Sequence, residues 1–389
     1  MMAYIVKAYR TAIGKAKKGS FKHTRSDDLA VAIINHIMKD TPELEADMIE
    51  DVLVGCAFPE GEQGLNMARN ISIKALGIKV PGTTVNRFCG SGLETIAMAA
   101  AKVDAGMGDI YIAGGAESMT MVPMTGFRLA PNYDVAHDMP EALVGMGITA
   151  EEVAKKYGIT REECDEFAYH SHIKAAKAIE TGRFKDEIVP VDVKEIFVKD
   201  GKKIEKDFVM DTDEGVRPDT TVEALSKLRP VFALNGMVTA GNSSQTSDGA
   251  AFVLVMSEKM VNKLNLKPLA RLVGYGVAGV EPLYMGIGPI AAVPVALKNA
   301  GMKLDDIGLI ELNEAFSTQS LAVIRELGLN TDILNVNGGA IALGHPLGCT
   351  GAKLTTQIIH ESHKRDVKYG MVTACIGGGQ GIAGIFEML

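Results

Sequence analysis

The chain has 389 residues, of which 47% are hydrophobic and 23% are charged, so it is long enough to form two or three lobes around a large core. Its net charge of −8 argues against broad nucleic-acid binding, and no run reaches the roughly 18 apolar residues that a membrane helix requires. Five cysteines without a CxxC pair argue against a disulfide framework or a structural zinc site. We therefore expect a soluble protein of a reducing compartment, the cytoplasm, without a metal or a signal peptide.

The first 116 residues alternate short apolar runs with amphipathic stretches. In chain order, the pattern predicts a strand within 48–55, a helix over 65–76, an extended segment at 83–86, a helix over 93–106 and a strand at 109–113. Strands that alternate with helices of this length favour βαβ units and a mostly parallel sheet.

The last third of the chain repeats this plan. The corresponding ranges are a strand at 306–311, a helix over 316–327, an extended pair at 336–337, a helix over 352–362 and a strand at 370–374. Two similar halves packed back to back would form a layered α/β/α/β/α body.

Between the two halves lies a stretch without this alternation. Residues 117–248 are richer in methionine, proline and charge, and they predict a long insertion of loops and helices over one face. Loops of that length in a compact protein are usually functional. We therefore divide the chain into a first half over 1–116, completed by 249–267, a loop domain over 117–248 and a second half over 268–389.

Cys89 lies in the segment 86–92 (NRFCGSG), directly after a predicted strand and before a predicted helix. At a helix N-terminus the dipole and the free N–H groups lower the pKa of a thiol, which favours a nucleophilic thiolate. Gly90 and Gly92 allow a ligand to approach the backbone closely. The alternative is a buried cysteine that packs as a small hydrophobic residue. The flanking glycines and the repeat position favour the nucleophile.

His345 lies in the glycine-rich segment 337–348 (NGGAIALGHPLG), which is the counterpart of the Cys89 loop in the second half. A neutral imidazole there would accept the proton of a thiol across the interface between the halves. The alternative is a loop histidine that caps the helix expected to begin near Ala352. His172, by contrast, lies on a polar helical stretch and is expected at the surface.

Two more strand ends contain polar groups. Cys375 ends a second-half strand and precedes the glycines 377–379, whose N–H groups would form an oxyanion pocket, although a glycine run also simply turns a corner. Asn313 ends another strand, and its alternative role is a helix N-cap. With Cys89 and His345 these residues place four polar groups at strand ends of one face, where ligands bind in open α/β sheets.

Other sulfur-containing residues bear on the shape of the site. Met146 and Met285 lie in similar glycine-containing segments, GMGI and YMGIGP. They either line an apolar acyl pocket or fill the core, and the pattern favours neither interpretation. Cys164 lies among acidic residues whose charge raises the pKa of a thiol, which makes it a poor nucleophile.

Together these motifs resemble those of the thiolase family, the coenzyme A-dependent acyltransferases of the thiolase fold. The segment 86–92 resembles the nucleophile motif, and 313–316 (NEAF) resembles the asparagine motif. The segment 344–348 (GHPLG) resembles the histidine motif, and 375–379 (CIGGG) the second-cysteine motif. Their order and spacing fit along essentially the whole chain. The resemblance implies two pseudo-symmetric βαβαβαββ halves in a five-layer body plus a loop domain, which agrees with the repeat.

The resemblance also implies a role for each reactive residue. Cys89 would accept an acyl group as a thioester after His345 removes its proton. Cys375 would move the proton at the α-carbon of the substrate. Asn313, through a bound water, would join His345 in one oxyanion hole, and the N–H groups of Cys89 and Gly377 would form the other.

Substrate-binding residues follow from the same resemblance. Arg217 matches a position near the adenine of coenzyme A, and Ser244 one that touches the pantetheine. Met146 and Met285 match acyl-pocket positions, and Phe316 at the end of the asparagine motif is expected with them. The implied activity is thiolytic cleavage of 3-ketoacyl-CoA to acetyl-CoA and a shortened acyl-CoA, a reversible Claisen condensation. Coenzyme A is then a substrate, and no permanently bound cofactor is implied.

Gly145 bears on the subtype. Biosynthetic acetoacetyl-CoA-forming relatives usually have a histidine before the methionine at 146, where this chain has glycine. The segments 146–151, 215–218 and 241–249 look more like those of the degradative 3-ketoacyl-CoA thiolases of β-oxidation. The alternative within the same chemistry is acetyl-CoA C-acetyltransferase acting on the four-carbon substrate.

Two neighbouring classes share the fold. Decarboxylating ketosynthases use one cysteine with two histidines, and Cys375 in the second-cysteine position argues against them. A thiolase-fold lipid carrier would have lost the reactive residues, and all four are present here. Because thiolases are typically dimers or tetramers, we expect a homodimer or homotetramer, with a hydratase/dehydrogenase subunit as a further partner and no nucleic acid or membrane insertion.

Overall fold

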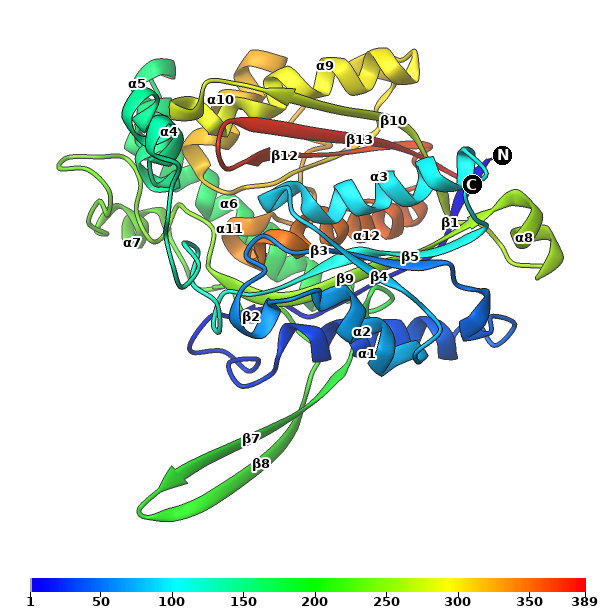
Figure 1. Ribbon diagram of the computed structural model, residues 1–389. Coiled ribbons are helices and arrows are strands. Elements are labelled where there is room, and N and C mark those ends of the chain that lie inside the picture. The colour runs from blue at the N-terminus through cyan, green and yellow to red at the C-terminus, as the bar shows by residue number, and fades with distance from the viewer. Residues whose placement is uncertain (1) are drawn as a thin grey trace.

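The computed structural model describes residues 2–389 (Figure 1). Its strands are β1 (Ala3–Thr11), β2 (Gly14–Lys15), β3 (Asp51–Gly55), β4 (Gly82–Val85), β5 (Ile110–Ser118), β6 (Ile188–Val189), β7 (Val191–Lys199), β8 (Lys202–Met210), β9 (Ser247–Ser257), β10 (Ala270–Gly279), β11 (Leu309–Leu312), β12 (Tyr369–Ile376) and β13 (Gln380–Met388). Its α-helices are α1 (Ser26–Lys39), α2 (Met67–Leu76), α3 (Ser91–Asp104), α4 (Tyr133–Asp138), α5 (Met146–Tyr157), α6 (Arg161–Glu180), α7 (Val222–Ser226), α8 (Glu258–Lys263), α9 (Gly288–Ala300), α10 (Ser317–Leu327), α11 (Ala340–Leu343) and α12 (Leu347–Arg365).

The main sheet has two halves that meet at one point. The strand order is β11-β12-β13-β10-β1-β9-β5-β3-β4, with β2 beside β9 and β6 beside β1. The halves join where β1 pairs with β10 at Ile5 and Ala270. Strands β3, β4 and β5 are parallel, whereas β9 and β13 run antiparallel to both of their neighbours in this order. The prediction of a mostly parallel sheet is therefore wrong, because strands such as β12 and β13, joined by a short turn, can only pair antiparallel.

Helices lie on both sides of each half and between them, which gives five layers (Figure 1). Helices α1 and α2 cover the outer face of the first half, and α9 covers that of the second. Helices α3 and α12 lie between the halves and pack with strands of both in a single apolar cluster. Fifteen of the nineteen residues of α12 are buried, as expected for a helix covered on both sides. The layered α/β fold predicted from the repeat is confirmed.

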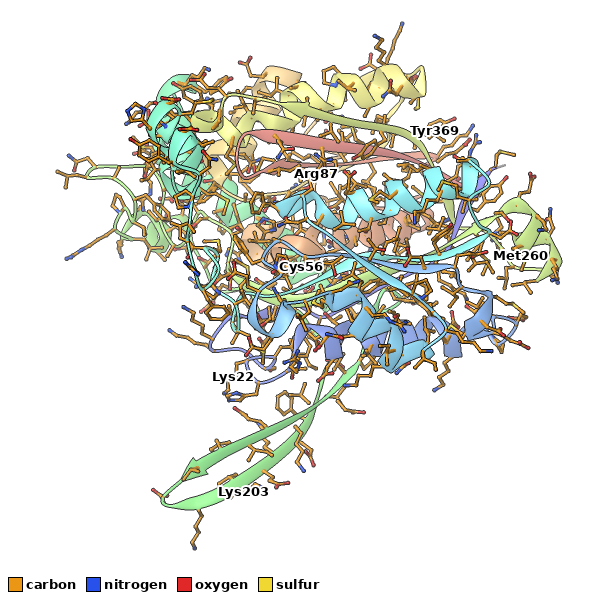
Figure 2. The ribbon with its side chains drawn as sticks, viewed as in Figure 1. Lys22, Cys56, Arg87, Lys203, Met260 and Tyr369 are labelled. Atoms are coloured by element: carbon orange, nitrogen blue, oxygen red, sulfur yellow. The ribbon has the colours of Figure 1, made fainter. Side chains whose placement is uncertain are left out.

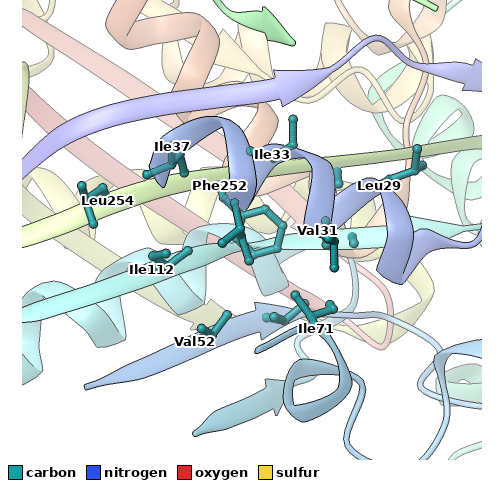
Figure 3. Close-up of a cluster of buried hydrophobic side chains, with 14 of the residues drawn as sticks. Leu29, Val31, Ile33, Ile37, Val52, Ile71, Ile112, Phe252 and Leu254 are labelled. Atoms are coloured by element: carbon teal, nitrogen blue, oxygen red, sulfur yellow. The ribbon is translucent and has the colours of Figure 1, made fainter. Parts of the chain in front are cut away.

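The outer layer of the first half is held by an apolar stripe on α1. Leu29, Ile33 and Ile37 follow at four-residue spacing and are fully buried against the sheet (Figure 3). They face Ile112 of β5 and Phe252 of β9, which are buried as well. Burial of each such side chain contributes about 1.5–3 kcal/mol, so this face fixes α1 on the sheet.

Glycines let the two central helices approach each other at their N-termini. A Cβ atom at Gly92 would lie 2.6 Å from the backbone nitrogen of Ala352, and one at Gly351 would lie 2.3 Å from that of Leu93. Neither position has room for a side chain. Because α3 follows Cys89 and α12 follows His345, this contact brings the two loops together.

The segment between the halves contains more regular structure than expected. The sequence predicts loops and helices there, and the structure adds the hairpin β7–β8, which projects from the body, with Lys203 near its end (Figure 2). Asp200 and Gly201 form its turn with φ values of 52° and 73°. An Asp-Gly turn between alternating apolar residues is a strong hairpin signal, and here the many charged residues concealed it. The domain boundaries given above stay a prediction.

Two details of the second half also differ from expectation. Val336 and Asn337 lie in a turn and not in a strand, and only Leu334 forms an isolated bridge, to Ile310. The side chain of Asn335 instead bonds both the N–H and the carbonyl of Leu312 at 2.9 Å, which replaces a strand pairing. Helix α12 begins at residue 347, five residues before the predicted start, which places the residues after His345 in its first turn.

No helix in the described part of the chain is long and apolar enough to span a bilayer.

Candidate active site

Each of the four predicted reactive residues lies either just before a central helix or at the end of a strand. Cys89 lies in the short helical turn η3 (Phe88–Gly90) directly before α3, and His345 lies two residues before α12. Asn313 follows β11, and Cys375 is next to the last residue of β12. The repeat therefore positions one residue of each half at the start of a central helix and two at strand ends.

These residues meet at a cavity of about 300 Å³. Of the predicted residues, the cavity is lined by Cys89, Met146, Ser244, Met285, Phe316, His345 and Cys375. Asn313 lies behind this wall, with its Nδ2 atom 3.3 Å from His345 Nε2. The lining is largely apolar, with six sulfur-containing side chains and two phenylalanines beside a few polar groups, the composition typical of a site for a largely apolar ligand.

Cys89 is 2% exposed, and its protonation differs from the prediction. Burial raises the pKa of its thiol to about 12, although the backbone N–H groups of Gly377 and of Cys89 itself act in the opposite direction. The expected lowering of this pKa by the helix N-terminus is therefore wrong, because the loss of solvation outweighs the N–H groups. At neutral pH the residue is a thiol, and a base is needed to activate it.

The imidazole of His345 is held on several sides. It is 4% exposed, its Nδ1 atom lies 2.5 Å from Thr350 Oγ1, and its backbone N–H donates to Ser247 Oγ at 3.1 Å. Burial lowers the pKa of His345 to about 3, and the positive charge of Lys353 acts in the same direction. The alternative role as a helix cap is not observed, because the N-cap of α12 is Pro346. The ring is thus a buried neutral base.

This pKa predicts an acid-sensitive fold. An unfolded histidine has a pKa of about 6.5, so the unfolded chain binds the proton first, and stability is lost as the pH falls below 6.5 toward 3. Between pH 7.5 and pH 5, the urea-unfolding free energy of wild type should fall by about 2 kcal/mol more than that of His345→Asn. The exposed residue His170 provides the control variant His170→Asn, which should follow wild type. Parallel losses in wild type and His345→Asn would contradict the buried neutral state.

Cys375 is 1% exposed and packs beside Met285, Ala315 and the partly buried Phe316. Burial raises the pKa of its thiol well above the usual range, and the neighbouring Cys89 acts in the same direction. The two cysteines are therefore close enough to influence each other's charge, and both are neutral at rest. All five cysteines of the described residues are free thiols.

A buried carboxylate that we did not predict connects the two loops. Glu117, at the end of β5, accepts hydrogen bonds from the N–H of Ala57 at 2.7 Å and from the N–H of Gly348 at 2.8 Å. The side chain of Gln63 donates to it as well, at 2.7 Å. Gly348 belongs to the first turn of α12, so Glu117 ties the helix that follows His345 to the first half. In the sequence, Glu117 is marked only as the single charged residue of an otherwise largely apolar strand.

The wall also contains Phe232, which sequence reasoning missed. Phe232 lines the cavity and packs edge-on against Phe316, with ring centroids 6.3 Å apart. It lies in an irregular stretch between α7 and β9, where no periodicity identifies a binding residue. Glycine at 147 accommodates it, since a Cβ there would lie 2.4 Å from the ring.

The two residues expected to contact coenzyme A lie in different surroundings. Ser244 lines the cavity, and its N–H donates to the carbonyl of Ala315 at 2.9 Å. Arg217 is exposed and lies outside the cavity lining, and its N–H donates to His172 Nδ1 at 3.2 Å. His172 is buried, so its expected surface position is wrong. It anchors the backbone that presents Arg217.

Among residues 2–389 the structure contains no cluster of three or more histidine, cysteine, aspartate or glutamate side chains that could hold a metal ion.

Comparison with known proteins identifies the class. Residues 3–259 match the family described as "Thiolase, N-terminal domain", and residues 266–388 match "Thiolase, C-terminal domain". The chain therefore belongs to the thiolase family.

Individual relatives cover the whole chain. It is 55% identical to the 3-ketoacyl-CoA thiolase of Bacillus subtilis over 99% of both chains, and 44% identical to the 3-ketoacyl-CoA thiolase FadA of Escherichia coli over 98% of both. Among solved structures it resembles the acetyl-CoA acetyltransferase of Bacillus anthracis, with a TM-score of 0.90 and 39% identity over 100% of this chain and 99% of that one. Human mitochondrial 3-ketoacyl-CoA thiolase aligns with a TM-score of 0.89 and 38% identity, over 100% of this chain and 98% of that one.

Proposed function

We propose that this chain is an acyltransferase that cleaves 3-ketoacyl-CoA with coenzyme A, giving acetyl-CoA and a shortened acyl-CoA, as in fatty acid β-oxidation. The observation that supports this most is the meeting of two thiols and an imidazole at one cavity, with the amide of Asn313 3.3 Å from the imidazole. The relatives named as 3-ketoacyl-CoA thiolases support the same activity over the full chain. Two thiols and an imidazole can move every proton that this chemistry requires.

In the first half-reaction, the sulfur of Cys89 attacks the 3-keto carbon while His345 Nε2 accepts the thiol proton. The C2–C3 bond then breaks, the acyl group stays on Cys89 as a thioester, and acetyl-CoA departs as its enolate. The pKa values of Cys89, about 12, and His345, about 3, disfavour a thiolate–imidazolium pair at rest. Proton transfer therefore accompanies attack on the substrate and does not precede it.

Cys375 completes the proton transfers. Its thiol protonates the α-carbon of the departing enolate, and the resulting thiolate accepts the proton of the coenzyme A thiol. Coenzyme A attacks the thioester on Cys89, and His345 returns its proton to the Cys89 sulfur as the shortened acyl-CoA leaves. The packing of Cys375 beside Cys89 and the acyl-pocket methionines supports this assignment.

Two substrate oxygens become negatively charged during the reaction, and each needs hydrogen-bond donors. For the enolate oxygen of acetyl-CoA we assign His345 and a water held by Asn313, whose Nδ2 atom is 3.3 Å from the ring. For the tetrahedral oxygen on the acyl carbon we assign the N–H groups of Cys89 and Gly377, which already face the Cys89 sulfur. Donors fixed in a dry site stabilise such charges more than water does.

The remaining residues bind the substrate. We assign Met146, Met285 and Phe316 to the acyl pocket, because they line the cavity beside Cys375. We assign Ser244 to the pantetheine for the same reason, and Arg217 to the adenine on family resemblance and its exposed position. Coenzyme A enters as a substrate.

The subtype is tested by chain length. We expect the coenzyme A-dependent loss of 3-ketoacyl-CoA enolate absorbance to be as fast with an eight- and a sixteen-carbon substrate as with acetoacetyl-CoA, or faster. Gly145 in place of the bulkier histidine at the cavity wall supports this expectation. Turnover of only the four-carbon substrate would instead support acetyl-CoA acetyltransferase activity, which the similarity to the Bacillus anthracis enzyme favours.

A non-enzymatic lipid carrier is the remaining candidate, and it predicts no turnover with any of the three substrates. The convergence of Cys89, His345 and Cys375 on one cavity, with Asn313 in contact with the imidazole, argues against it.

For location and partners we assign the cytoplasm, because the chemistry requires reduced thiols. Acyl-CoA and coenzyme A are the small-molecule partners. Assembly as a homodimer or homotetramer, and association with a hydratase/dehydrogenase subunit, rest on the family resemblance alone.

A further inference from the structure

The ring of His345 has a different neighbour at each nitrogen. Nδ1 lies 2.5 Å from the hydroxyl oxygen of Thr350, and Nε2 lies 3.3 Å from Asn313 Nδ2. Thr350 is in the first turn of α12 and is 1% exposed. Its hydroxyl also donates to the carbonyl of Pro346 at 3.0 Å.

Counting protons on these contacts assigns the tautomer of the ring. A hydroxyl has one proton, and we assign that of Thr350 to its bond with the carbonyl of Pro346, which can only accept. A lone pair of Thr350 then faces Nδ1, which must supply the proton of the short contact. At the other side, the structure places the amide nitrogen of Asn313 at Nε2, and a donor there pairs with a lone pair of the ring. Both ends of the ring give the same answer.

We propose that Thr350 is a positioning residue that holds the neutral imidazole of His345 in the Nδ1–H tautomer, so that Nε2 keeps the lone pair that a base needs. This inference rests on the role of His345 as the base for Cys89. In the other tautomer Nε2 would carry a proton, and it could not accept the one from the thiol.

A hydroxyl suits this position better than the carboxylate that often accompanies a catalytic histidine. A buried carboxylate would favour the imidazolium and raise the pKa of the ring, whereas burial keeps His345 neutral here. The hydroxyl fixes the ring without adding a charge. Because its hydroxyl donates to the carbonyl of Pro346, the side chain of Thr350 is already fixed in the free enzyme.

The tautomer can be read without activity. In protein labelled with ¹⁵N-histidine, the ring signals of His345 are identified by their loss in His345→Asn. We expect the ring of His345 in wild type to show a protonated Nδ1 and an unprotonated Nε2. In Thr350→Val we expect a mixture of the two tautomers. A protonated Nε2 in wild type would overturn the inference.

Kinetics provides the second measurement. We expect Thr350→Val to slow the formation of acyl-enzyme from labelled acetyl-CoA by about tenfold to a hundredfold, by analogy with the loss of a hydrogen bond that orients a metal-bound histidine. Thr350→Ser keeps the hydroxyl and should restore the rate. The matched control is Thr355→Val, since Thr355 is buried on the same helix and makes the same bond to a carbonyl four residues earlier, at 2.8 Å, without a histidine contact.

The outcomes separate this inference from the function it depends on. If His345→Asn forms acyl-enzyme at the wild-type rate, the assigned role of His345 is wrong. If His345→Asn is inactive while Thr350→Val matches wild type, His345 is the base and the assigned role of Thr350 is wrong. A loss in Thr350→Val that Thr355→Val shares would also overturn it, because it would reflect helix stability.

Discussion

Replacing Cys89 by alanine should abolish the transfer of a labelled acyl group from acetyl-CoA to the protein. Cys89 lines the cavity at the start of α3, where the N–H groups of Gly377 and of Cys89 itself face its sulfur. The cavity lining contains one other thiol, that of Cys375, which lies at the end of β12 beside Met285, Ala315 and Phe316. We expect a loss of at least about four orders of magnitude, as for removal of other covalent nucleophiles.

The measurement is retention of radioactivity on protein after denaturation and gel filtration, followed by identification of the labelled peptide. The matched control is Cys164→Ala, since Cys164 is equally buried but packs against Val153 and Ala322, away from the cavity. That variant should label as wild type does. Urea unfolding of both variants establishes that each is folded. Label that persists in Cys89→Ala would contradict the assignment, and its position would identify the true nucleophile.

This prediction does not depend on a reactive thiolate at rest. Burial raises the pKa of Cys89, so slow alkylation of the free enzyme by iodoacetamide is compatible with full activity. The sequence predicts the place of Cys89 in the fold correctly but not its ionisation, because the helix dipole depends only on residues that are neighbours in the chain. The solvation of a side chain depends on the segments that cover it, and those come from both halves and the loop domain.

The contrast between neighbours in the chain and contacts made by folding also explains which parts of the fold could be predicted. Apolar periodicity identified α2, α3, α10 and β12 within a few residues, because these elements are built on local patterns. It did not show that β9 returns antiparallel between β1 and β5, since that pairing joins residues far apart in the sequence. The role of Asn335 could not be predicted for a related reason. Its side chain replaces the backbone hydrogen bonds of a strand pairing, and apolar periodicity does not reveal such a contact.

At the site, the residues to which we assign the chemistry lie in recognisable sequence motifs, whereas the residues that support them do not. Cys89, His345, Cys375 and Asn313 stand in glycine-rich or strand-end motifs. Their supports do not: Glu117 lies inside a strand, Phe232 in an irregular loop, and Thr350 in a helix whose start was misplaced. Each makes its contact across the chain or around a helical turn, so its role depends on the fold and on no local motif.

Replacing Cys375 by serine should separate the two half-reactions. Serine keeps a hydroxyl at the end of β12, but an alcohol is a far weaker acid than a thiol and does not readily protonate a carbanion. We expect cleavage of 3-ketoacyl-CoA to fall by about a hundredfold to ten-thousandfold. Formation of acyl-enzyme from acetyl-CoA should fall much less, because the group that leaves there is a thiolate, which needs little help from an acid.

The test compares loss of acetoacetyl-CoA enolate absorbance with the single-turnover rate of protein labelling by acetyl-CoA. The control is Met285→Leu, which changes the wall beside Cys375 without altering any ionisable group. If packing alone mattered, both variants would slow the two half-reactions by similar factors. Equal losses in Cys375→Ser would therefore reject Cys375 as the acid at the α-carbon. A large loss confined to carbon–carbon cleavage, absent from Met285→Leu, follows only if the Cys375 thiol itself delivers the proton.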